Sequence, residues 1–324
     1  MSPDLRFARV GRATLAYETL GPEHAPPVLL IHGLGQQLTG WPYALVRSLV
    51  QGGFRVIRFD NRDIGKSSRM QGKAHLTRHY LCAQLGLGSC PPYTLEEMAH
   101  DTLGLIDSLK LGPVHLVGAS MGGMIAQLVA ARFPCAVRSL TSIMSSSGDR
   151  RLPKARADVL RLMLNPPRTP SLQREVDYNV QLWELIASPA HPTARETLRA
   201  RVEDDLRRNA PAAGGIERQF AAILASGSRV PLLAQITSPS LVLHGLEDPL
   251  IPFEAGRSTA EHIPGAQFES IAGMGHDLPP ELLPALAQRL LRHFRQASRA
   301  RLPCVDLRTA PDLQPINQQT GTRP

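Results

Sequence analysis

The chain has 324 residues, of which 43% are hydrophobic and 20% charged, the ordinary balance of a soluble globular protein with one large domain or one domain carrying an insertion. No apolar stretch reaches membrane-spanning length and the first residues lack the layout of a signal peptide, so we expect a cytoplasmic location and no membrane span. The net charge of +8 does not indicate a nucleic-acid partner, because only four of the 36 basic residues are lysines and the arginines are scattered without interleaved aromatic residues.

Glycine and proline residues divide the first 148 residues into alternating strand and helix candidates, which predicts a mostly parallel sheet with helices on its faces. The first two strands are expected to form an antiparallel hairpin through Gly11 and Arg12. Thr94 and Glu97 form a capping-box pattern that marks the start of a helix. In chain order we expect strands over 7–10, 14–19, 28–32, 55–60, 114–117 and 137–142, and helices over 41–51, 94–109 and 121–133.

The pattern changes at Gly148. From there to about residue 236 no buried strand is indicated, and prolines separate charged segments that predict helices over 151–163, 172–186 and 193–208. The sheet pattern then resumes, with strands over 240–244 and 267–271 and helices over 253–262 and 280–294. We therefore divide the chain into an α/β core over 1–148 and 237–298, a helical cap over 149–236, and a tail over 299–324 that we expect to be disordered.

The cysteines do not indicate a metal site. Cys82, Cys90, Cys135 and Cys304 show neither a C-x-x-C pair nor another metal-ligand spacing. Cys82 and Cys90 could form a disulfide in an exported protein, but in a cytosolic protein we expect separate reduced thiols. We expect no metal and no cofactor.

The segment Gly118-Ala119-Ser120-Met121-Gly122 lies between an apolar strand candidate and a helix candidate. A serine with glycines two residues away on each side, at a strand-to-helix junction, is the pattern of a nucleophile elbow. The turn is so tight that it needs small residues on both sides, and it exposes the serine hydroxyl beside the next backbone N–H. Ser120 alone is weak evidence in a chain with 26 glycines, so its partners decide the interpretation.

An acid and a base follow Ser120 in the order that this type of elbow requires. Asp248 comes just after a strand candidate, where its carboxylate can accept a hydrogen bond from a histidine ring. Glu247 is the competing acid. His276 lies in a glycine-framed loop after the last strand candidate and is the expected general base. Ser120, Asp248 and His276 are therefore the predicted catalytic residues of a serine hydrolase.

A serine hydrolase must also stabilise the negative charge that develops on the carbonyl oxygen. Met121 follows the nucleophile and offers one backbone N–H for this oxyanion hole. We expect the second donor to be the N–H of Leu34, because Gly33 lets the chain turn so that the following amide faces the site.

The chain resembles the α/β-hydrolase superfamily over about residues 7–297. Five segments carry this resemblance: 32–35, 59–67, 118–122, 244–249 and 273–279. The segments 60–67 and 273–279 are similar to the branch that contains anthracycline methyl esterases and many carboxylesterases. The resemblance implies an eight-stranded sheet, with the site at the strand ends under a helical cap inserted after the sixth strand. The segment 70–92 is longer than the usual connection, and it either lines the site entrance or elaborates the surface.

The candidate substrate-binding residues are Gly33, Trp41, Met124, Trp183 and Ile251, although apolar side chains of this kind more often belong to the core. No fixed cation is evident among them. The expected function is therefore hydrolysis of carboxylic esters of small to medium, fairly apolar substrates through an acyl-enzyme, with a small-molecule ester as the partner.

Other functions share the same three residues. A C–C bond or enol-lactone hydrolase and a cofactor-free haloperoxidase or perhydrolase would use the same triad, and a non-enzymatic binding protein could retain the fold. The oligomeric state stays open, with a homodimer as one option.

Overall fold

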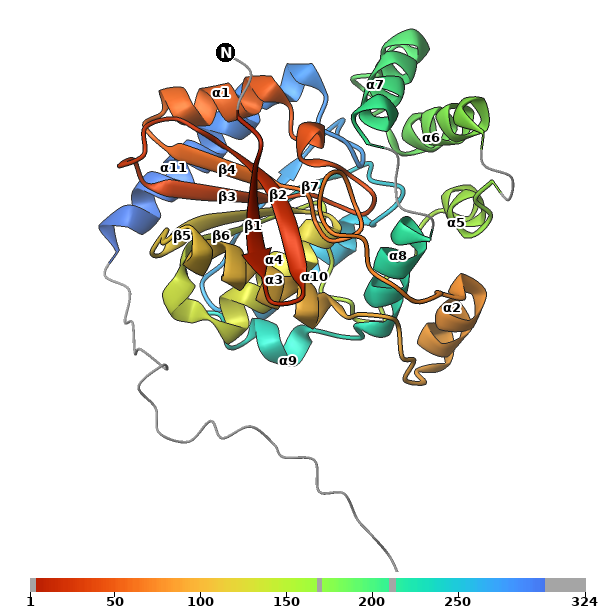
Figure 1. The fold of residues 1–324 in the computed structure, drawn as a ribbon. Helices are drawn as coiled ribbons and strands as arrows, with labels where there is room; N and C mark the ends of the chain where they lie inside the picture. The colour runs from red at the N-terminus through yellow and green to blue at the C-terminus, as the bar shows by residue number, and fades with distance from the viewer. Residues whose placement is uncertain (1–3, 168–170, 210–213, 301–324) are drawn as a thin grey trace, which may run out of the picture.

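The computed structural model describes residues 4–167, 171–209 and 214–300. In this part of the chain a single eight-stranded sheet has the order β1-β2-β4-β3-β5-β6-β7-β8 (Figure 1). β2 pairs antiparallel with β1 and with β4, and all other neighbours are parallel, which confirms the expected α/β fold. The strands are β1 (Arg6–Val10), β2 (Ala13–Leu20), β3 (Pro27–Ile31), β4 (Arg55–Phe59), β5 (Val114–Ala119), β6 (Val137–Ile143), β7 (Ser240–Gly245) and β8 (Gln267–Ile271).

Helices cover both faces of the sheet (Figure 1). α1 (Tyr43–Gln51) and α11 (Leu283–Arg299) pack on one face. α3 (Leu95–Ser108), α4 (Met121–Arg132) and α10 (Phe253–His262) lie on the other face. A parallel sheet covered on both sides places the carboxyl ends of its strands at one edge, where side chains from several strands can meet.

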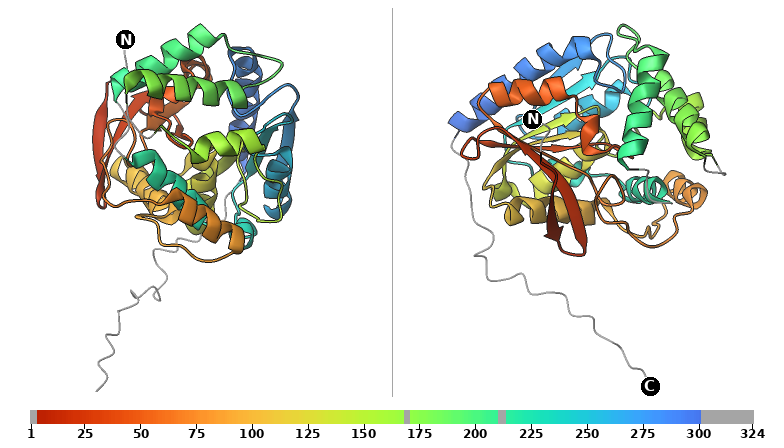
Figure 2. Two further views of the ribbon diagram at one scale, coloured as in Figure 1. Left: turned by 90° about the vertical axis from the view of Figure 1, so that its right-hand side faces the viewer. Right: turned by 45° about the horizontal axis from the view of Figure 1, so that its top comes forward.

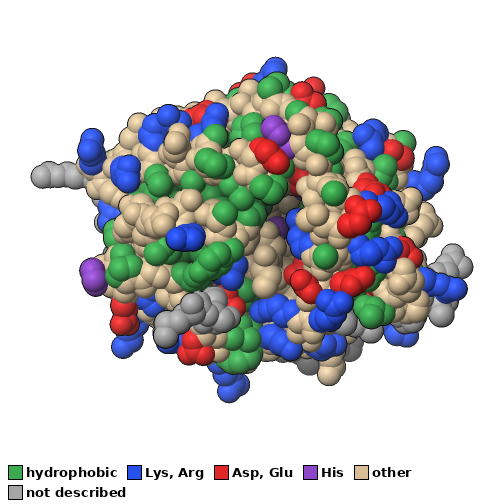
Figure 3. All heavy atoms as spheres, turned by 90° about the horizontal axis from the view of Figure 1, so that it is seen from above, with side chains coloured by type: hydrophobic (Ala, Val, Ile, Leu, Met, Phe, Trp, Pro, Cys, Tyr) green, Lys and Arg blue, Asp and Glu red, His purple; other side chains and the backbone are tan. Residues whose placement is uncertain are grey.

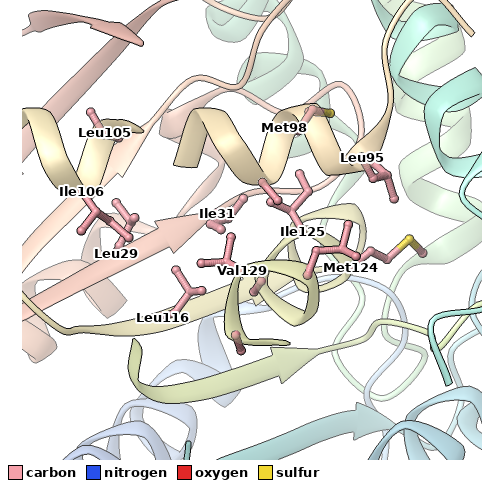
Figure 4. Close-up of a cluster of buried hydrophobic side chains, with 14 of the residues drawn as sticks. Leu29, Ile31, Leu95, Met98, Leu105, Ile106, Leu116, Met124, Ile125 and Val129 are labelled. Atoms are coloured by element: carbon pink, nitrogen blue, oxygen red, sulfur yellow. The ribbon is translucent and has the colours of Figure 1, made fainter. Parts of the chain in front are cut away.

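Strand β3 contributes to both apolar layers because its side chains alternate between the two faces. Leu29 and Ile31 belong to the cluster on the α3 and α4 side, and Val28 and Leu30 belong to the cluster on the α1 and α11 side. Burial on both faces explains why this strand is a continuous apolar run rather than an alternating one. Figure 4 shows the first cluster, in which the following side chains meet from β3, β5, α3 and α4: Leu29, Ile31, Leu116, Leu95, Met98, Leu105, Ile106, Met124, Ile125 and Val129.

Within the described residues the chain between β6 and β7 is helical, as the sequence predicted. α6 and α7 lie side by side, and their contact is made by Val176, Val180, Leu198 and Val202 (Figure 2). α8 lies beside α2 (Leu76–Leu85), a helix from a much earlier part of the chain. The inserted helices are α5 (Ala157–Leu164), α6 (Leu172–Ile186), α7 (Arg195–Arg208), α8 (Gly215–Ala225) and α9 (Val230–Leu233).

Several helix boundaries differ from the sequence-based expectations. The helix expected from residue 151 begins only at Ala157, because the chain forms a turn over residues 149–152 and the next residue is Pro153, which has no backbone N–H for a helix interior. The helix α2 within 70–92 was not predicted. α11 starts at Leu283 and runs to Arg299, beyond the expected end at residue 294. The rest of the tail expected to be disordered, over 301–324, lies outside the described residues.

The capping box at the start of α3 is confirmed. The Glu97 N–H donates to Thr94 Oγ1 at 3.2 Å, and the Thr94 N–H donates to Glu97 Oε2 at 2.9 Å. Each side chain thereby satisfies a backbone donor that the first helical turn leaves free.

Among the described helices, none combines the length and the apolar composition needed to cross a bilayer.

Candidate active site

Ser120 occupies a sharp turn between β5 and α4, with φ 55° and ψ −121°. A non-glycine residue rarely adopts a positive φ, so the surrounding structure must hold this conformation. The flanking glycines make the turn possible: a Cβ at Gly118 would lie 2.1 Å from the carbonyl oxygen of Gly122, and one at Gly122 would lie 2.1 Å from that of Ile31. The local geometry is that of a nucleophile elbow.

The structure brings together Ser120, His276 and Asp248, which are far apart in the sequence. His276 Nε2 lies 3.0 Å from Ser120 Oγ, and His276 Nδ1 lies 2.6 Å from Asp248 Oδ2. The three residues follow the carboxyl ends of β5, β8 and β7, which are parallel strands of the same sheet. A hydroxyl, an imidazole and a carboxylate in this order can move a proton from the hydroxyl to the ring.

Asp248 is held as an anion. Its Oδ1 accepts hydrogen bonds from the backbone N–H groups of Leu250 at 2.9 Å and Ile251 at 2.8 Å. Burial by itself would raise the pKa of the Asp248 carboxyl, but the attraction of His276 and hydrogen bonds from His244 and His276 outweigh it and lower the pKa. A permanent carboxylate here fixes the histidine tautomer and stabilises the ring when it is protonated.

Glu247 has a different partner. Its Oε2 accepts a hydrogen bond from the backbone N–H of Gly273 at 2.8 Å, on the approach to the histidine loop. Of the two acids that the sequence offered, Asp248 is therefore the one that contacts the ring of His276.

The loop that carries His276 is fastened to the end of α6. The backbone N–H of His276 donates to the carbonyl of Ile186 at 2.7 Å, and that of Gly275 donates to Ser188 Oγ at 2.9 Å. The fully buried Ser188 also bonds to Asp277 Oδ1 through its backbone N–H at 2.9 Å and through its hydroxyl. The inserted helices thus help to position the histidine.

The two amides expected to form an oxyanion hole lie on the segments that flank Ser120. A Cβ at Gly33 would lie 3.0 Å from the Cβ and 3.5 Å from the Oγ of Ser120, so the 33–35 loop passes directly beside the hydroxyl. Within the described residues, neither the N–H of Leu34 nor that of Met121 donates to another protein group. Two free amides beside a serine hydroxyl can serve a developing oxyanion.

Comparison with known proteins agrees with this geometry. The family model described as the alpha/beta hydrolase fold matches residues 26–283. This chain belongs to the α/β-hydrolase family. The hydrolase is 30% identical over 306 residues to the rhodomycin D methylesterase DnrP of Streptomyces peucetius, covering 88% of this chain and 96% of the relative. It is also 30% identical over 314 residues to the rhodomycin D methylesterase DauP of Streptomyces sp. strain C5, covering 90% and 99%.

Solved structures show the same fold. The enol-lactonase from Burkholderia xenovorans LB400 aligns with a TM-score of 0.68 at 24% sequence identity, over 90% of the hydrolase and 100% of that chain. At this identity the likeness concerns the fold alone.

A buried glutamine of α8 braces the 33–35 loop of the hydrolase. Gln219 Oε1 accepts the backbone N–H of Gly35 at 3.0 Å, and its Nε2 donates to the carbonyl of Arg62 at 2.9 Å. The residue is fully buried, so these bonds have no competition from water. The sequence analysis missed Gln219, because nothing in a helical residue 99 positions after Ser120 indicates which loop it will contact.

Next to this loop, His32 is an uncharged ring. Burial is the largest cause that lowers the pKa of His32 to about 4, and the charges of Arg201 and His276 lower it further, while the nearby backbone of Gly40 raises it. The ring of His32 lies 5.0 Å from that of Trp41, centroid to centroid. The ring of His32 therefore adds no positive charge near Ser120 at neutral pH.

The remaining expected pocket residues lie in different surroundings. Trp41 is fully buried in the cluster on the α1 and α11 side. Met124 and Ile251 pack at the edge of the cluster on the α3 and α4 side, and the backbone of Ile251 binds Asp248. Trp183 lies on α6, half-buried against the contact with α7.

The segment 70–92 lies next to the inserted helices. Its helix α2 packs beside α8, and Arg218 of α8 forms a two-pronged ion pair with the buried Asp63 just before this segment, at 2.7 and 2.9 Å. Cys82 and Cys90 are free thiols.

Proposed function

We propose that this hydrolase is a serine esterase in which Ser120 is the nucleophile, His276 the general base and Asp248 the acid that orients it. The observation that carries the proposal is the unbroken line from Ser120 Oγ through the ring of His276 to Asp248, with links of 3.0 and 2.6 Å. The two unengaged amides of Leu34 and Met121 supply the other requirement of acyl transfer, a site for the oxyanion.

The reaction begins when Ser120 Oγ attacks the ester carbonyl and His276 Nε2 takes the hydroxyl proton. The charge that forms on the carbonyl oxygen is accepted by the N–H groups of Leu34 and Met121. His276 then protonates the leaving alkoxide, which departs as an alcohol and leaves the acyl group on Ser120. Water, deprotonated by the same imidazole, then attacks the acyl-enzyme. The bond from the acyl carbon to Ser120 Oγ breaks, His276 returns the proton to that oxygen, and the carboxylic acid is released.

The relatives bear on the substrate. Both of those described above are methylesterases of rhodomycin D, a name that places ester hydrolysis in this branch of the family. We propose that the hydrolase cleaves small to medium esters whose body is apolar, since Met124, Ile251 and Trp183 border the strand ends or the inserted helices above them.

The test is a substrate panel with one inactive variant. We expect para-nitrophenyl acetate and butyrate to be hydrolysed. Ser120→Ala should lose several hundredfold or more in kcat, up to about 10⁶-fold as for other serine nucleophiles, with little change in stability. Enol-lactones and vinylogous diketones are included to measure lactonase and C–C bond hydrolysis. Cleavage of those compounds without cleavage of the simple esters would replace the esterase proposal by one of these two reactions.

Two further properties are proposed together with this function. The helices between β6 and β7 form a cap over 149–236, separate from a core over 1–148 and 237–298. The protein resides in the cytoplasm. A homodimer is one option for its oligomeric state, and sedimentation at several concentrations distinguishes it from a monomer.

A further inference from the structure

Five arginines lie on α7, and four of them form ion pairs. These pairs are Arg195 with Glu184, Arg199 with Asp177, Arg207 with Glu203 and Asp204, and Arg208 with Asp60. Arg201 is different. To the described residues it makes neither an ion pair nor a hydrogen bond, and its contact is with the ring of Trp183, whose centroid lies 4.3 Å from the guanidinium carbon.

Arg201 belongs to the face of α7 that is turned toward the core. Residues four and seven positions later share its face of the helix. Asp205 Oδ1 accepts a hydrogen bond from Thr39 Oγ1 at 2.8 Å, and Arg208 reaches the buried Asp60 at 2.9 Å. Both contacts are to the core segments that lie next to the 33–35 loop. Arg201 is one turn nearer the start of α7 on the same side.

The aromatic partner places Arg201 near the histidine loop as well. Trp183 lies one turn before Ile186, whose carbonyl accepts the backbone N–H of His276. The guanidinium of Arg201 therefore extends from α7 onto the end of α6, the segment whose Ile186 carbonyl binds the His276 loop. Further along α7, Asp205 and Arg208 contact segments next to the 33–35 loop. Seen from above, the surface is hollowed between the core and the inserted helices, and both basic and acidic side chains stand on the side of the inserted helices (Figure 3).

Protein surrounds part of the Arg201 side chain. Its side chain is exposed to solvent, yet burial is the largest cause that lowers its pKa, against the attraction of Asp205 and Asp277. Both observations hold for a group that water reaches from one side while protein surrounds it on the others. The positive charge of Arg201 also lowers the pKa of the buried His32.

The two carboxylates whose charges raise the pKa of Arg201, those of Asp205 and Asp277, have hydrogen-bond partners of their own. Asp205 accepts from the hydroxyl of Thr39, and Asp277 accepts from the backbone and the hydroxyl of Ser188. Both raise the pKa of Arg201 through their charge alone, without an ion-pair contact to it. A guanidinium stacked on an indole keeps its N–H donors along its edge, which suits a carboxylate, and partial exclusion of water strengthens that contact.

We propose that Arg201, stacked on Trp183, binds a free carboxylate of the substrate, so that the preferred esters carry an apolar body and a second, anionic end. This proposal rests on the proposed ester hydrolysis. It changes the expectation drawn from the sequence, which found no fixed cation near the pocket.

A matched pair of substrates tests the proposal. Mono-para-nitrophenyl adipate differs from para-nitrophenyl hexanoate by a carboxylate in place of the terminal methyl group. We expect kcat/KM for the adipate to exceed that for the hexanoate by about tenfold or more, as for one charge-assisted hydrogen-bonded contact. Arg201→Gln should bring this ratio close to one, and Arg201→Lys should retain part of it. Because the contact is between charges, the wild-type ratio should fall as the salt concentration rises.

The control is Arg199→Gln, which removes an equal charge from the same helix at a residue paired with Asp177. It should leave the ratio unchanged. An Arg201→Gln ratio equal to that of the wild-type protein would overturn the proposal and leave ester hydrolysis standing.

A binding measurement separates the two proposals. Monomethyl adipate is titrated calorimetrically into Ser120→Ala protein, with and without Arg201→Gln. The anion site predicts that the dissociation constant of monomethyl adipate rises about tenfold when Arg201→Gln is added to Ser120→Ala. This result would support the anion site even if the wild-type protein cleaved neither para-nitrophenyl ester and the esterase proposal failed. Equal binding in both proteins contradicts the anion site.

Discussion

His276 Nδ1 and Asp248 Oδ2 are 2.6 Å apart, and this short contact selects one acid from two adjacent ones. The carboxylate of Glu247 instead accepts a hydrogen bond from the backbone N–H of Gly273. It therefore supports the histidine loop without contacting the ring of His276. The two residues can therefore be tested against each other.

Asp248→Asn should lower kcat on para-nitrophenyl butyrate by about 10³ to 10⁴, because an amide in this position no longer fixes the histidine tautomer or stabilises the imidazolium. Glu247→Gln should stay within about fivefold of the wild-type protein, since an amide oxygen can still accept the Gly273 N–H. Equal losses in both variants would mean that Asp248 is not the orienting acid.

Gln219→Leu should lower kcat by about tenfold to a hundredfold while KM changes little, as expected when an oxyanion donor is displaced rather than removed. The buried Gln127 offers a matched control, because it also makes two side-chain bonds, to Ser142 and Arg229. Gln127→Leu should lower stability without this selective loss of kcat. The affinity for a trifluoromethyl ketone, which mimics the tetrahedral adduct, should weaken in parallel with kcat/KM for Gln219→Leu. An unchanged affinity would contradict a role at the oxyanion.

Arg218→Leu should lower the free energy of unfolding by about 3–5 kcal/mol, because it leaves the fully buried Asp63 without its counter-ion. Arg207→Leu is the comparison, since this arginine pairs with Glu203 and Asp204 on the surface, where such pairs contribute about 0–1 kcal/mol. Urea unfolding of both variants measures the difference. Similar values for the two would show that the pair with Asp63 does not hold α8 to the core.

Stability should fall as the solution is acidified, in part because of His115. Burial first, and then repulsion by His293 and Arg138, lower the pKa of His115 to about 3. A lowered pKa in the folded state means that the unfolded chain takes up a proton near pH 6.5 while the folded one does not. The contribution is present above about pH 6.5 and is lost as the pH falls toward 3, by about 2 kcal/mol per such histidine at about pH 5.

Urea unfolding at about pH 7.5 and pH 5 measures this loss. His115→Gln should show a smaller difference between the two pH values than the wild-type protein. A variant with the same pH dependence as the wild-type protein would rule out His115 as a source.

The sequence predicted the sheet and the three central side chains because their signals are local. The elbow requires glycines at 118 and 122, and the apolar runs of β3 and β5 follow from burial on both faces. The order of Ser120, Asp248 and His276 along the chain then limited the choice of partners. Only the fold could decide between Asp248 and Glu247, since both follow β7 and differ in which loop they meet.

Other features depend on contacts between distant segments. The helix α2 leaves Leu81 and Leu85 exposed and buries chiefly His79, so it lacks the apolar stripe by which a helix is detected in a sequence. Arg201 is one arginine among many, and that it has no ion partner among the described residues is visible only once α6 and α7 are placed. Gln219 becomes informative only through its bond to Gly35.

The most direct test of the catalytic role of Ser120 is covalent labelling of the folded protein with a fluorophosphonate, followed by mass spectrometry of the digested chain. We predict one adduct, on Ser120, that is absent from Ser120→Ala and from protein unfolded in urea before labelling. A folded wild-type protein that stays unlabelled, or that carries the adduct on another residue, would contradict the proposed nucleophile.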